Sequence, residues 1–574
     1  MKQLLLGNEA VARGLYEAGV SFVSSYPGTP STEITEAAVK YDEITCEWAP
    51  NEKVGVESAA GASFAGARSF SAMKHVGLNV AADPVFTMSY IGVNGGMVIG
   101  VADDPGMHSS QNEQDSRNYA IAAKLPMLEP ADSAECRDFT KMAYELSEQF
   151  DTPVLLRLTT RISHSRSLVE LCERAERPCK PYEKNPAKNV MLPAFAKIKH
   201  PLVEERTCKL TQWAEQADMN RIEDNGAKVG VICAGSCYQY THEAMGDSVS
   251  YLKLGMVHPL PVDLIKKFAS MVETLYVVEE LDDIIESHCA KIGVKVIGKE
   301  IFPRCGEFDQ SLVRQKLTGE SLPVQSLDTD VPVRPPVMCC GCPHRGLFYA
   351  LKREGVYVSG DIGCYTLGAS APLGMMDTCV CMGASVSALH GYNKVLGEKS
   401  EKKSVAVIGD STFIHSGITG LIDIAYNASN SVVVVLDNSI TGMTGHQQNP
   451  TTGYNIKGDP ATAVDLEALC KAVGIQRVRV CDPYDIKQTR QVIHEELQAD
   501  GPSVVISRRP CALLKSVKHK PALAVDAQRC IGCKACMGIG CPAISMKDGK
   551  AAIDRTQCVG CGVCEGLCPK NAIG

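Results

Sequence analysis

Two short cysteine-rich segments near the end of this 574-residue chain constrain its fold more than any other feature. In each segment, three cysteines are separated by two residues, and a fourth stands directly before a proline. The eight cysteines are Cys530, Cys533, Cys536, Cys541, Cys558, Cys561, Cys564 and Cys568. A C-x2-C-x2-C loop can wrap three thiolates around one corner of an iron–sulfur cubane, so the fourth thiolate must come from elsewhere. The proline restricts the chain there and turns it away from the cluster.

This pattern resembles the bacterial-type ferredoxins with two [4Fe–4S] clusters, in which each fourth thiolate comes from the other motif. The resemblance assigns the two ligand sets as Cys530, Cys533, Cys536 and Cys568, and Cys558, Cys561, Cys564 and Cys541. The alternative is a pair of zinc ribbons, but zinc takes four ligands per site and fits two cysteine triplets poorly. One departure is that four residues, rather than the usual three, separate Cys536 from Cys541. We expect the longer loop to alter the potential of that cluster.

Composition narrows the class of protein further. Hydrophobic residues make up 45% and charged residues 22% of the chain, which is typical of globular proteins. The net charge of −8 argues against nucleic acid as a partner. Of the 26 cysteines, the eighteen outside the two motifs show no disulfide pattern, so we expect a reducing, anaerobic cytoplasm.

No segment of the sequence reads as a targeting or membrane signal. Met1–Leu6 runs directly into polar residues, without the pattern of a signal peptide. The apolar run Gly92–Val101 is short and interrupted by glycines, so we expect no membrane span. The predicted location is therefore the cytoplasm.

Alternating strands and helices are expected along most of the chain, which indicates an α/β fold. Predicted strands are Val20–Ser24, Ile44–Trp48, Pro153–Leu158, Val229–Cys233, Leu275–Val278, Ser404–Ile408 and Ser431–Leu436, with helices at Val54–Arg68 and Ile418–Ala428. We expect α/β domains at residues 1–165, 226–320 and 337–515, with a linker containing some helix at 166–225. The Pro-rich stretch 331–336 marks one boundary, and Lys515–Lys520 is a basic hinge into the cysteine-rich domain at 520–574.

Two polar residues follow neighbouring predicted strands of the third domain. Asp410 comes after Ser404–Ile408, and Asn438 after Ser431–Leu436. Ligands of open α/β sheets bind at the carboxyl ends of the strands, so we expect the two side chains to lie together. A carboxylate, an amide oxygen and phosphate oxygens suit Mg²⁺. The helix start after Gly409 adds donors for a phosphate.

The same residues resemble the thiamine diphosphate motif, Gly-Asp-Gly followed by a distant Asn. By that resemblance Asp410, Asn438 and the Ile440 carbonyl hold Mg²⁺ on the diphosphate. Ser411 replaces the second glycine of the motif, which is tolerable if that residue needs no positive φ. The alternative is an ordinary strand-end turn. Thiamine diphosphate stabilises the negative charge left when a 2-oxo acid loses CO2, and iron–sulfur clusters can take up the electrons.

Thiamine enzymes use a carboxylic acid in a second α/β domain to activate the pyrimidine ring. Glu52 stands where a strand passes into a helix, as the activating glutamate does in this superfamily, and Glu57 is its rival. Both could instead be solvated acids at a helix start, where acids are favoured.

The loop Ser24–Glu33 matches the Tyr-Pro-x-Thr-Pro-Ser loop of 2-oxo acid:ferredoxin oxidoreductases, whose threonine meets the substrate. Thr29 is therefore a candidate catalytic residue, although the loop could merely cap a helix. Lys74 or Arg117 could bind a substrate carboxylate, but lone basic residues are more often plain surface charges.

Together these stretches resemble the 2-oxo acid:ferredoxin oxidoreductases, and among them the alpha subunits that act on indolepyruvate. The most specific stretches are Ala49–Gly55, Ala72–Asn79, Cys342–Arg345 and Gly409–Ser411. The resemblance implies three thiamine-enzyme-type α/β domains, namely pyrimidine-binding, transketolase-C-like and diphosphate-binding domains, followed by an α+β two-cluster ferredoxin domain. It also implies a smaller beta subunit in a hetero-oligomer of two alpha and two beta chains, coenzyme A as co-substrate and ferredoxin as electron acceptor.

The role of three further cysteines is open. Cys339 and Cys342 have metal-binding spacing, and Cys364 follows them. In some related two-subunit enzymes such cysteines hold a cluster with a fourth cysteine beyond the thiamine motif, but residues 446–469 contain none. We therefore expect these thiols to line the thiamine pocket, or to be free buried cysteines. Other readings of the whole chain are a relative acting on phenylpyruvate or a branched-chain 2-oxo acid, an electron-transfer subunit with inactive α/β domains, and a non-oxidative decarboxylase.

Overall fold

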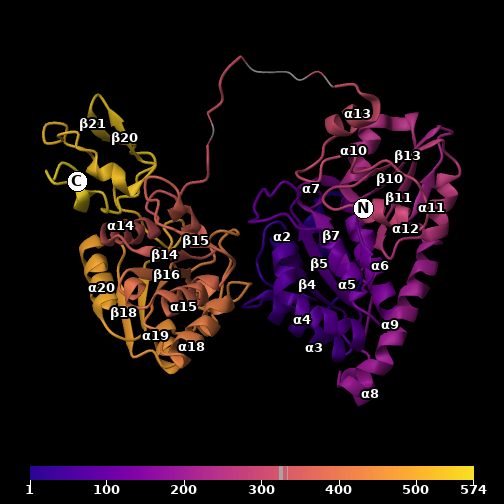
Figure 1. Cartoon of the computed structure of the whole chain (residues 1–574), viewed down its shortest axis with the longest axis horizontal. Helices are drawn as coiled ribbons and strands as arrows, with labels where there is room; N and C mark the ends of the chain where they lie inside the picture. The colour runs from indigo at the N-terminus through magenta and orange to yellow at the C-terminus, as the bar shows by residue number, and fades with distance from the viewer. Residues whose placement is uncertain (322, 324–327, 333) are drawn as a thin grey trace. The chain divides into compact units, whose positions relative to one another are not determined.

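The predicted strands of the N-terminal half assemble into two sheets in the computed structural model (Figure 1). The structure describes residues 1–321, 323, 328–332 and 334–574. They form two units, Met1–Asp328 and Thr329–Gly574, and each is described by itself. The predicted Pro-rich boundary at 331–336 lies partly outside the described residues. No described helix is both long and apolar enough to cross a bilayer.

The larger sheet of the first unit has seven strands. In spatial order they are β12 (Met256–His258), β6 (Met127–Leu128), β7 (Val154–Thr159), β5 (Met97–Asp103), β4 (Ser69–Lys74), β2 (Phe22–Ser25) and β3 (Thr45–Trp48). All neighbouring pairs are parallel except β12 with β6. Every residue of β5 is buried, as expected for a central strand covered on both faces.

Helices follow most of these strands. They are α1 (Gly7–Glu17), α2 (Thr32–Ala38), α3 (Glu52–Phe64), α4 (His75–Ile91), α5 (Arg117–Ala123), α6 (Ser133–Phe150) and α7 (Thr160–His164). The Asn51 side chain caps α3 by accepting a hydrogen bond from the Val54 N–H at 2.9 Å. The small residues of α3 allow it to pack against both α4 and β4.

Residues 166–225, expected as a linker with some helix, also contain regular strand. They hold β8 (Arg166–Glu170), α8 (Pro186–Asn189), α9 (Pro193–Ala214) and β9 (Arg221–Glu223). β8 pairs antiparallel with β1 (Lys2–Leu6). On α9, Arg206 donates a 2.9 Å hydrogen bond to the Ser89 hydroxyl of α4. The segment is therefore packed onto the first unit.

A further sheet of the first unit has four strands, besides the β1–β8 pair. Its order is β13 (Thr274–Val278), β10 (Val229–Ala234), β11 (Ser250–Leu254) and β9, of which β9 is antiparallel to its neighbour. Its helices are α10 (Gly235–Met245), η1 (Gly246–Ser248), α11 (Val262–Ala269), α12 (Ile284–Lys291) and α13 (Gln310–Thr318). One apolar cluster contains residues of both sheets, such as Ile99 of β5 and Leu252 of β11. The two sheets therefore share a core, and β12 extends the larger one.

The second unit is built on a six-stranded parallel sheet. Its order is β15 (Thr378–Cys379), β14 (Tyr357–Gly360), β16 (Ser404–Gly409), β17 (Val432–Asp437), β19 (Ser503–Arg508) and β18 (Arg477–Cys481). Alternate residues of β17 enter different apolar clusters, with Val434 in one and Val433 in the other. The sheet is thus covered on both faces.

The helical segments of this unit are α14 (His344–Glu354), η2 (Cys364–Ala369), α15 (Ala384–Leu396), α16 (Glu398–Glu401), α17 (Asp410–Thr412), the π-helical turn Phe413–Gly417, α18 (Ile418–Tyr426), α19 (Leu466–Ala472) and α20 (Ile486–Gln498). The cysteine-rich end adds η4 (Ala535–Ile539), the hairpin β20 (Ile544–Lys547) and β21 (Lys550–Ile553), and η5 (Glu565–Leu567). The expected α/β fold class, with a small cysteine-rich domain at the end, is confirmed.

The cysteine-rich end is packed against helices of the six-stranded sheet domain. Ile539 and Ile544 share an apolar cluster with Tyr349 of α14 and Ile486 of α20. Figure 1 shows this yellow segment beside α14, which contacts η4. The basic stretch Lys515–Lys520 is therefore only the covalent connection, because apolar contacts elsewhere fix the domain.

Candidate active site and cluster cavities

Asp410 and Asn438 lie at the same edge of the second unit's sheet. β16 and β17 are parallel neighbours, with Gly409 opposite Leu436, so the residues that follow both strands emerge together. Asp410 is the first residue of α17 and is buried. Its carboxylate accepts hydrogen bonds from the Ser411 N–H at 2.8 Å and the Thr451 hydroxyl at 3.2 Å.

Electrostatics at this edge favour a cation. Burial, with the nearby charge of Asp437 adding to it, raises the pKa of Asp410 to about 7. Ser411, Thr451 and Asn449 oppose the shift, and all three offer neutral donors. A divalent ion would supply positive charge that neutral donors cannot, so the donor set fits Mg²⁺.

Further polar residues surround Asn438 at this edge of the sheet. The Asn438 side-chain oxygen accepts a 3.3 Å hydrogen bond from the Ile440 N–H. Its amide nitrogen lies 3.5 Å from Nε2 of His344, whose pKa burial lowers to about 4, so the imidazole is neutral. Ser411 accepts a 3.0 Å hydrogen bond from the Thr441 hydroxyl. Ser411 lies in a helical turn, so the departure from glycine carries no positive-φ strain.

The two glutamates proposed to activate the pyrimidine ring differ in how deeply they are buried. Glu52 opens α3 and is only 4% exposed. A Cβ at Gly77 would lie 2.6 Å from its carboxylate, so only glycine leaves room for Glu52 beside α4. Glu57 is exposed and forms an ion pair with Lys53. Of the two, only Glu52 is held in a protected environment.

The Thr29 loop meets Lys74 and the segment after β5. Thr29 is half-buried, and its carbonyl accepts a 3.3 Å hydrogen bond from the Ser109 hydroxyl. The Lys74 ammonium donates to the Ser109 carbonyl at 3.0 Å. Burial lowers the pKa of Lys74, although Asp104 and Glu52 oppose this. The structure therefore gathers Thr29, Lys74 and the charge of Glu52 in one region of the first unit.

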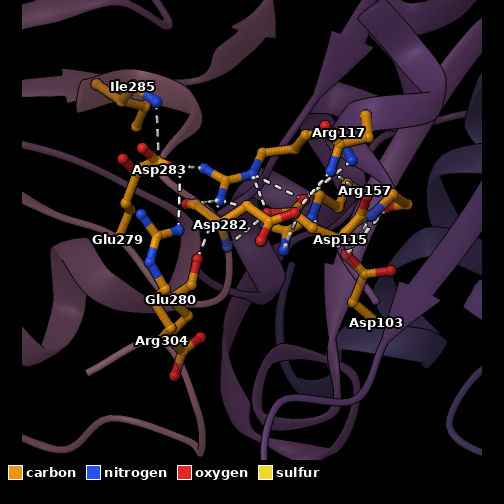
Figure 2. A network of polar contacts seen from close by, with 12 residues as sticks. Asp103, Asp115, Arg117, Arg157, Glu279, Glu280, Asp282, Asp283, Ile285 and Arg304 are labelled. Carbon is orange, nitrogen blue, oxygen red and sulfur yellow. Dashed lines mark hydrogen bonds and ion pairs between the residues drawn. The ribbon is translucent and has the colours of Figure 1, made fainter. Parts of the chain in front are cut away.

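Arg117, considered above as a surface charge or a carboxylate ligand, has a structural position instead. It is 2% exposed and pairs with Asp115 at 2.6 Å and with Glu279 at 2.7 Å. Figure 2 shows its guanidinium between these acids, with Arg157 and Asp103 beside them. Glu279 follows β13, whereas Asp115 precedes α5, so the ion pairs join the four-stranded and the seven-stranded sheets of the first unit. Both readings made from the sequence are therefore corrected.

The eight motif cysteines line two separate cavities. The first cavity contains Cys530, Cys533, Cys536 and Cys568. The second contains Cys541, Cys558, Cys561 and Cys564, together with Cys340. In both cavities the distant cysteine comes from the other motif, which is the arrangement that two cubanes require.

Backbone donors around the first cavity suit bound thiolates. The Ala551 N–H lies 3.4 Å from the Cys530 sulfur, and the Ala572 N–H lies 3.2 Å from the Cys568 sulfur. Such N–H···S contacts lower the pKa of Cys530 and favour its thiolate. Among the described residues, no three His, Cys, Asp or Glu side chains converge as they would on a single metal ion. The four thiolates around a cubane lie farther apart than the ligands of a single metal ion, so this finding is compatible with clusters in the two cavities.

A second group of thiols lies near Asn438. Its members are Cys339, Cys342, Cys364 and Cys511. Burial raises the pKa of Cys342, with Cys364 and Cys339 adding to it, and burial and Cys339 also raise the pKa of Cys511. Burial, strengthened by Cys511 and Cys339, raises the pKa of Cys364 to about 11. The Cys511 N–H donates to the Asn438 carbonyl at 2.9 Å.

Cys511 is the functional candidate that the sequence analysis missed. Cys511 follows β19, well beyond residues 446–469 in which a fourth cysteine was expected. β19 pairs in parallel with β17, so Cys511 emerges at the same sheet edge as Asn438. Its position just after a buried strand is the sequence feature that could have identified Cys511 as a candidate site residue.

Three family models match the chain. "Pyruvate flavodoxin/ferredoxin oxidoreductase, thiamine diP-bdg" covers residues 13–230, and "Thiamine pyrophosphate enzyme, C-terminal TPP binding domain" covers residues 361–507. "4Fe-4S dicluster domain" covers residues 522–569. The chain therefore carries thiamine diphosphate-binding domains and a domain for two [4Fe–4S] clusters.

Two curated relatives match nearly the whole length, and a third matches part of it. The indolepyruvate oxidoreductase subunit IorA of Archaeoglobus fulgidus is 41% identical, over 100% of this chain and 97% of its own. That of Pyrococcus horikoshii is also 41% identical, over 95% and 92% of the two chains. The 2-oxoglutarate synthase subunit KorA of Methanocaldococcus jannaschii is 25% identical over 46% of this chain and 85% of its own. With identity at this level from end to end, the chain belongs to the indolepyruvate oxidoreductase IorA family.

Proposed function

We propose that this protein catalyses the thiamine diphosphate-dependent oxidative decarboxylation of an arylpyruvate such as indolepyruvate. Arylpyruvate, coenzyme A and two oxidised ferredoxins give the arylacetyl-CoA, CO2, a proton and two reduced ferredoxins. One observation carries the proposal, namely that the buried strand-end pair Asp410 and Asn438 occurs in the same unit as two four-cysteine sets. The names of the curated relatives support the substrate, and the thiamine and cluster domains matched in this chain support the chemistry.

Each pocket residue has a distinct task in this proposal. Thiamine diphosphate, when bound, supplies the electron sink for decarboxylation. Asp410, Asn438 and the Ile440 carbonyl would hold Mg²⁺ against the diphosphate, and the helix start at Ser411 would donate backbone N–H groups to it. The neutral His344 imidazole would position the Asn438 amide.

The first unit would serve the pyrimidine ring and the substrate. Glu52 would hydrogen-bond the ring and hold the proton that activates it. Thr29 would bind the 2-oxo acid, and the Lys74 ammonium is the nearby positive charge that suits its carboxylate. We further propose a smaller beta subunit, a two-alpha, two-beta assembly and a reducing cytoplasmic setting, on the basis of the family resemblance and the free thiols.

The direct test is reduction of a ferredoxin-analogue dye. The purified chain with its partner subunit, thiamine diphosphate, Mg²⁺ and coenzyme A is offered a panel of 2-oxo acids. We expect the highest kcat/KM with indolepyruvate. Preference for phenylpyruvate or a branched-chain 2-oxo acid would change the substrate assignment only. If no 2-oxo acid reduced the dye and no thiamine diphosphate bound, the chain would be an electron-transfer subunit.

We also propose that Cys339, Cys342, Cys364 and Cys511 hold a third [4Fe–4S] cluster. The Cys511 N–H donates to the Asn438 carbonyl, and a Cβ at Gly442 would lie 3.4 Å from the Cys364 sulfur and 3.9 Å from the Asn438 amide nitrogen. Cys340, the residue after Cys339, lines the second ferredoxin cavity. Electrons would then pass from the thiamine pocket through this group to the second cavity. The first cavity would be the exit, because Cys533 is exposed and Ile531 is 60% exposed.

Iron content tests the third cluster. With four iron atoms in each cubane, we expect about twelve per wild-type chain and about eight in Cys511→Ser. Cys470→Ser is the matched control, since Cys470 is buried in an apolar cluster of the same unit, and it should keep the wild-type iron content. About eight iron atoms in the wild type, unchanged in Cys511→Ser, would mean that these thiols only line the pocket.

A further inference from the structure

The two cavities of the ferredoxin domain differ in their number of thiols. Four cysteines line the first cavity, which is the number that one cubane needs. Five line the second, because Cys340 joins Cys541, Cys558, Cys561 and Cys564. Cys340 belongs to the loop before α14, far from the ferredoxin motifs in the sequence. One thiol of the second cavity is therefore in excess.

Packing fixes Cys340 at this cavity. The Cys340 sulfur lies 3.8 Å from the side-chain oxygen of Gln557, the residue before Cys558. The next residue, Gly341, has φ +70°, and a Cβ there would lie 2.2 Å from a methyl group of Val559. Only glycine allows this close approach of the loop to the cluster-binding segment.

A second contact fixes the loop from the Cys541 side. Arg345 donates a 3.2 Å hydrogen bond to the Ile539 carbonyl and another to the Gly540 carbonyl. The same guanidinium donates to the Cys339 carbonyl at 3.1 Å. Arg345 thus holds the residue before Cys340 and the residue before Cys541 together.

The neighbour of Cys340 is the ligand with the irregular spacing. Cys541 ends the longer of the two motif loops, with four residues after Cys536. Cys340 and Cys541 line this cavity together, so both thiols border the space that the cluster would fill.

We propose that Cys340 and Cys541 are interchangeable fourth ligands of the cluster in the second cavity. In the exchange, the iron–Cys541 bond breaks and an iron–Cys340 bond forms. The proton that the Cys340 thiol releases passes to the Cys541 thiolate. No oxidation state changes and no further reactant is consumed. The inference rests on the proposed clusters and concerns only which thiol completes one of them.

Alanine variants test the exchange in the full chain with its partner subunit, prepared anaerobically. We compare Cys541→Ala, Cys340→Ala and the double variant by iron analysis and by EPR after dithionite reduction. Cys568→Ala is the matched control, because it removes the corresponding ligand from the cavity without a spare thiol. Alanine cannot bind iron, so any cluster retained in Cys541→Ala requires another ligand.

We expect Cys541→Ala and Cys340→Ala to keep the wild-type iron content and both ferredoxin-domain [4Fe–4S] signals. The double variant should lose one signal, and Cys568→Ala should lose the other. If Cys541→Ala loses its signal as the double variant does, the exchange is wrong although the cluster assignment stands. Retention of that signal by the double variant would also overturn it. If Cys568→Ala and the double variant both keep every signal, the underlying cluster assignment is wrong.

Labelling of the wild-type protein keeps the proposal testable if Cys541→Ala does not fold. The cluster-loaded protein is treated anaerobically with iodoacetamide, and its peptides are analysed by mass spectrometry. Interchangeable ligands leave either thiol free part of the time, so we expect label on both Cys340 and Cys541. Label on Cys340 alone would show that Cys541 never leaves the iron and would overturn the proposal.

Discussion

Asp410→Ala should abolish binding of thiamine diphosphate and Mg²⁺, with affinity falling by more than about 100-fold. Asp410 supplies the buried carboxylate of the strand-end pocket, and its partners Ser411 and Thr451 are neutral donors that cannot replace the charge. Calorimetric titration with thiamine diphosphate in the presence of Mg²⁺ measures the loss. Asp410→Asn keeps the size of the side chain, so its equal failure would assign the effect to charge.

The same variants should keep their iron–sulfur EPR signals, because the cluster cysteines lie on other segments. This control separates loss of a ligand from loss of the fold. Asp465→Asn is a matched surface substitution, since Asp465 only caps α19, and it should bind the cofactor normally. Wild-type affinity for thiamine diphosphate in Asp410→Ala would show that Asp410 is not part of the binding site.

Glu52→Gln should keep thiamine diphosphate bound but lower kcat by about 10²–10⁴-fold, the usual contribution of a positioned proton-transfer group. The amide fills the same buried space beside Gly77 but cannot hold the proton as the acid does. Dye reduction with indolepyruvate at saturating cofactor gives kcat, and calorimetry gives cofactor affinity.

Glu57→Gln is the matched control, because Glu57 lies on the same helix but is exposed and paired with Lys53. It should retain near wild-type turnover. An inactive Glu57→Gln beside an active Glu52→Gln would reverse the assignment of the activating acid.

Strand-end residues were the part of the site that the sequence predicted best. Parallel strands bring their carboxyl ends to one edge, so Asp410 and Asn438 could be placed together from two buried runs alone. The same rule applies to Cys511 after β19, but its use required knowing that β19 pairs with β17. Sheet order depends on tertiary packing, and no local pattern in the sequence gives it.

Partners that are distant in sequence account for the wrong expectations. Arg117 looked like a lone charge because Glu279, its partner across the two sheets, carries no sequence signal of the pairing. The Lys515–Lys520 stretch is the predicted basic hinge, but the sequence shows no sign of the apolar contacts of Tyr349 with the ferredoxin domain, which are equally non-local. In both cases the composition of the segment is evident from the sequence, but the residues that contact it in the fold are not.

The placement of β12 has a consequence for how the protein is made. β6 is a two-residue strand whose outer edge is paired by β12, and β12 lies well beyond it in the chain. During synthesis the N-terminal strands leave the ribosome first, so β6 has an open hydrogen-bonding edge until residues 256–258 emerge. A nascent chain stalled near residue 225 would expose that edge to other chains. We therefore expect chaperone association to peak at this length and to end once β12 has been added.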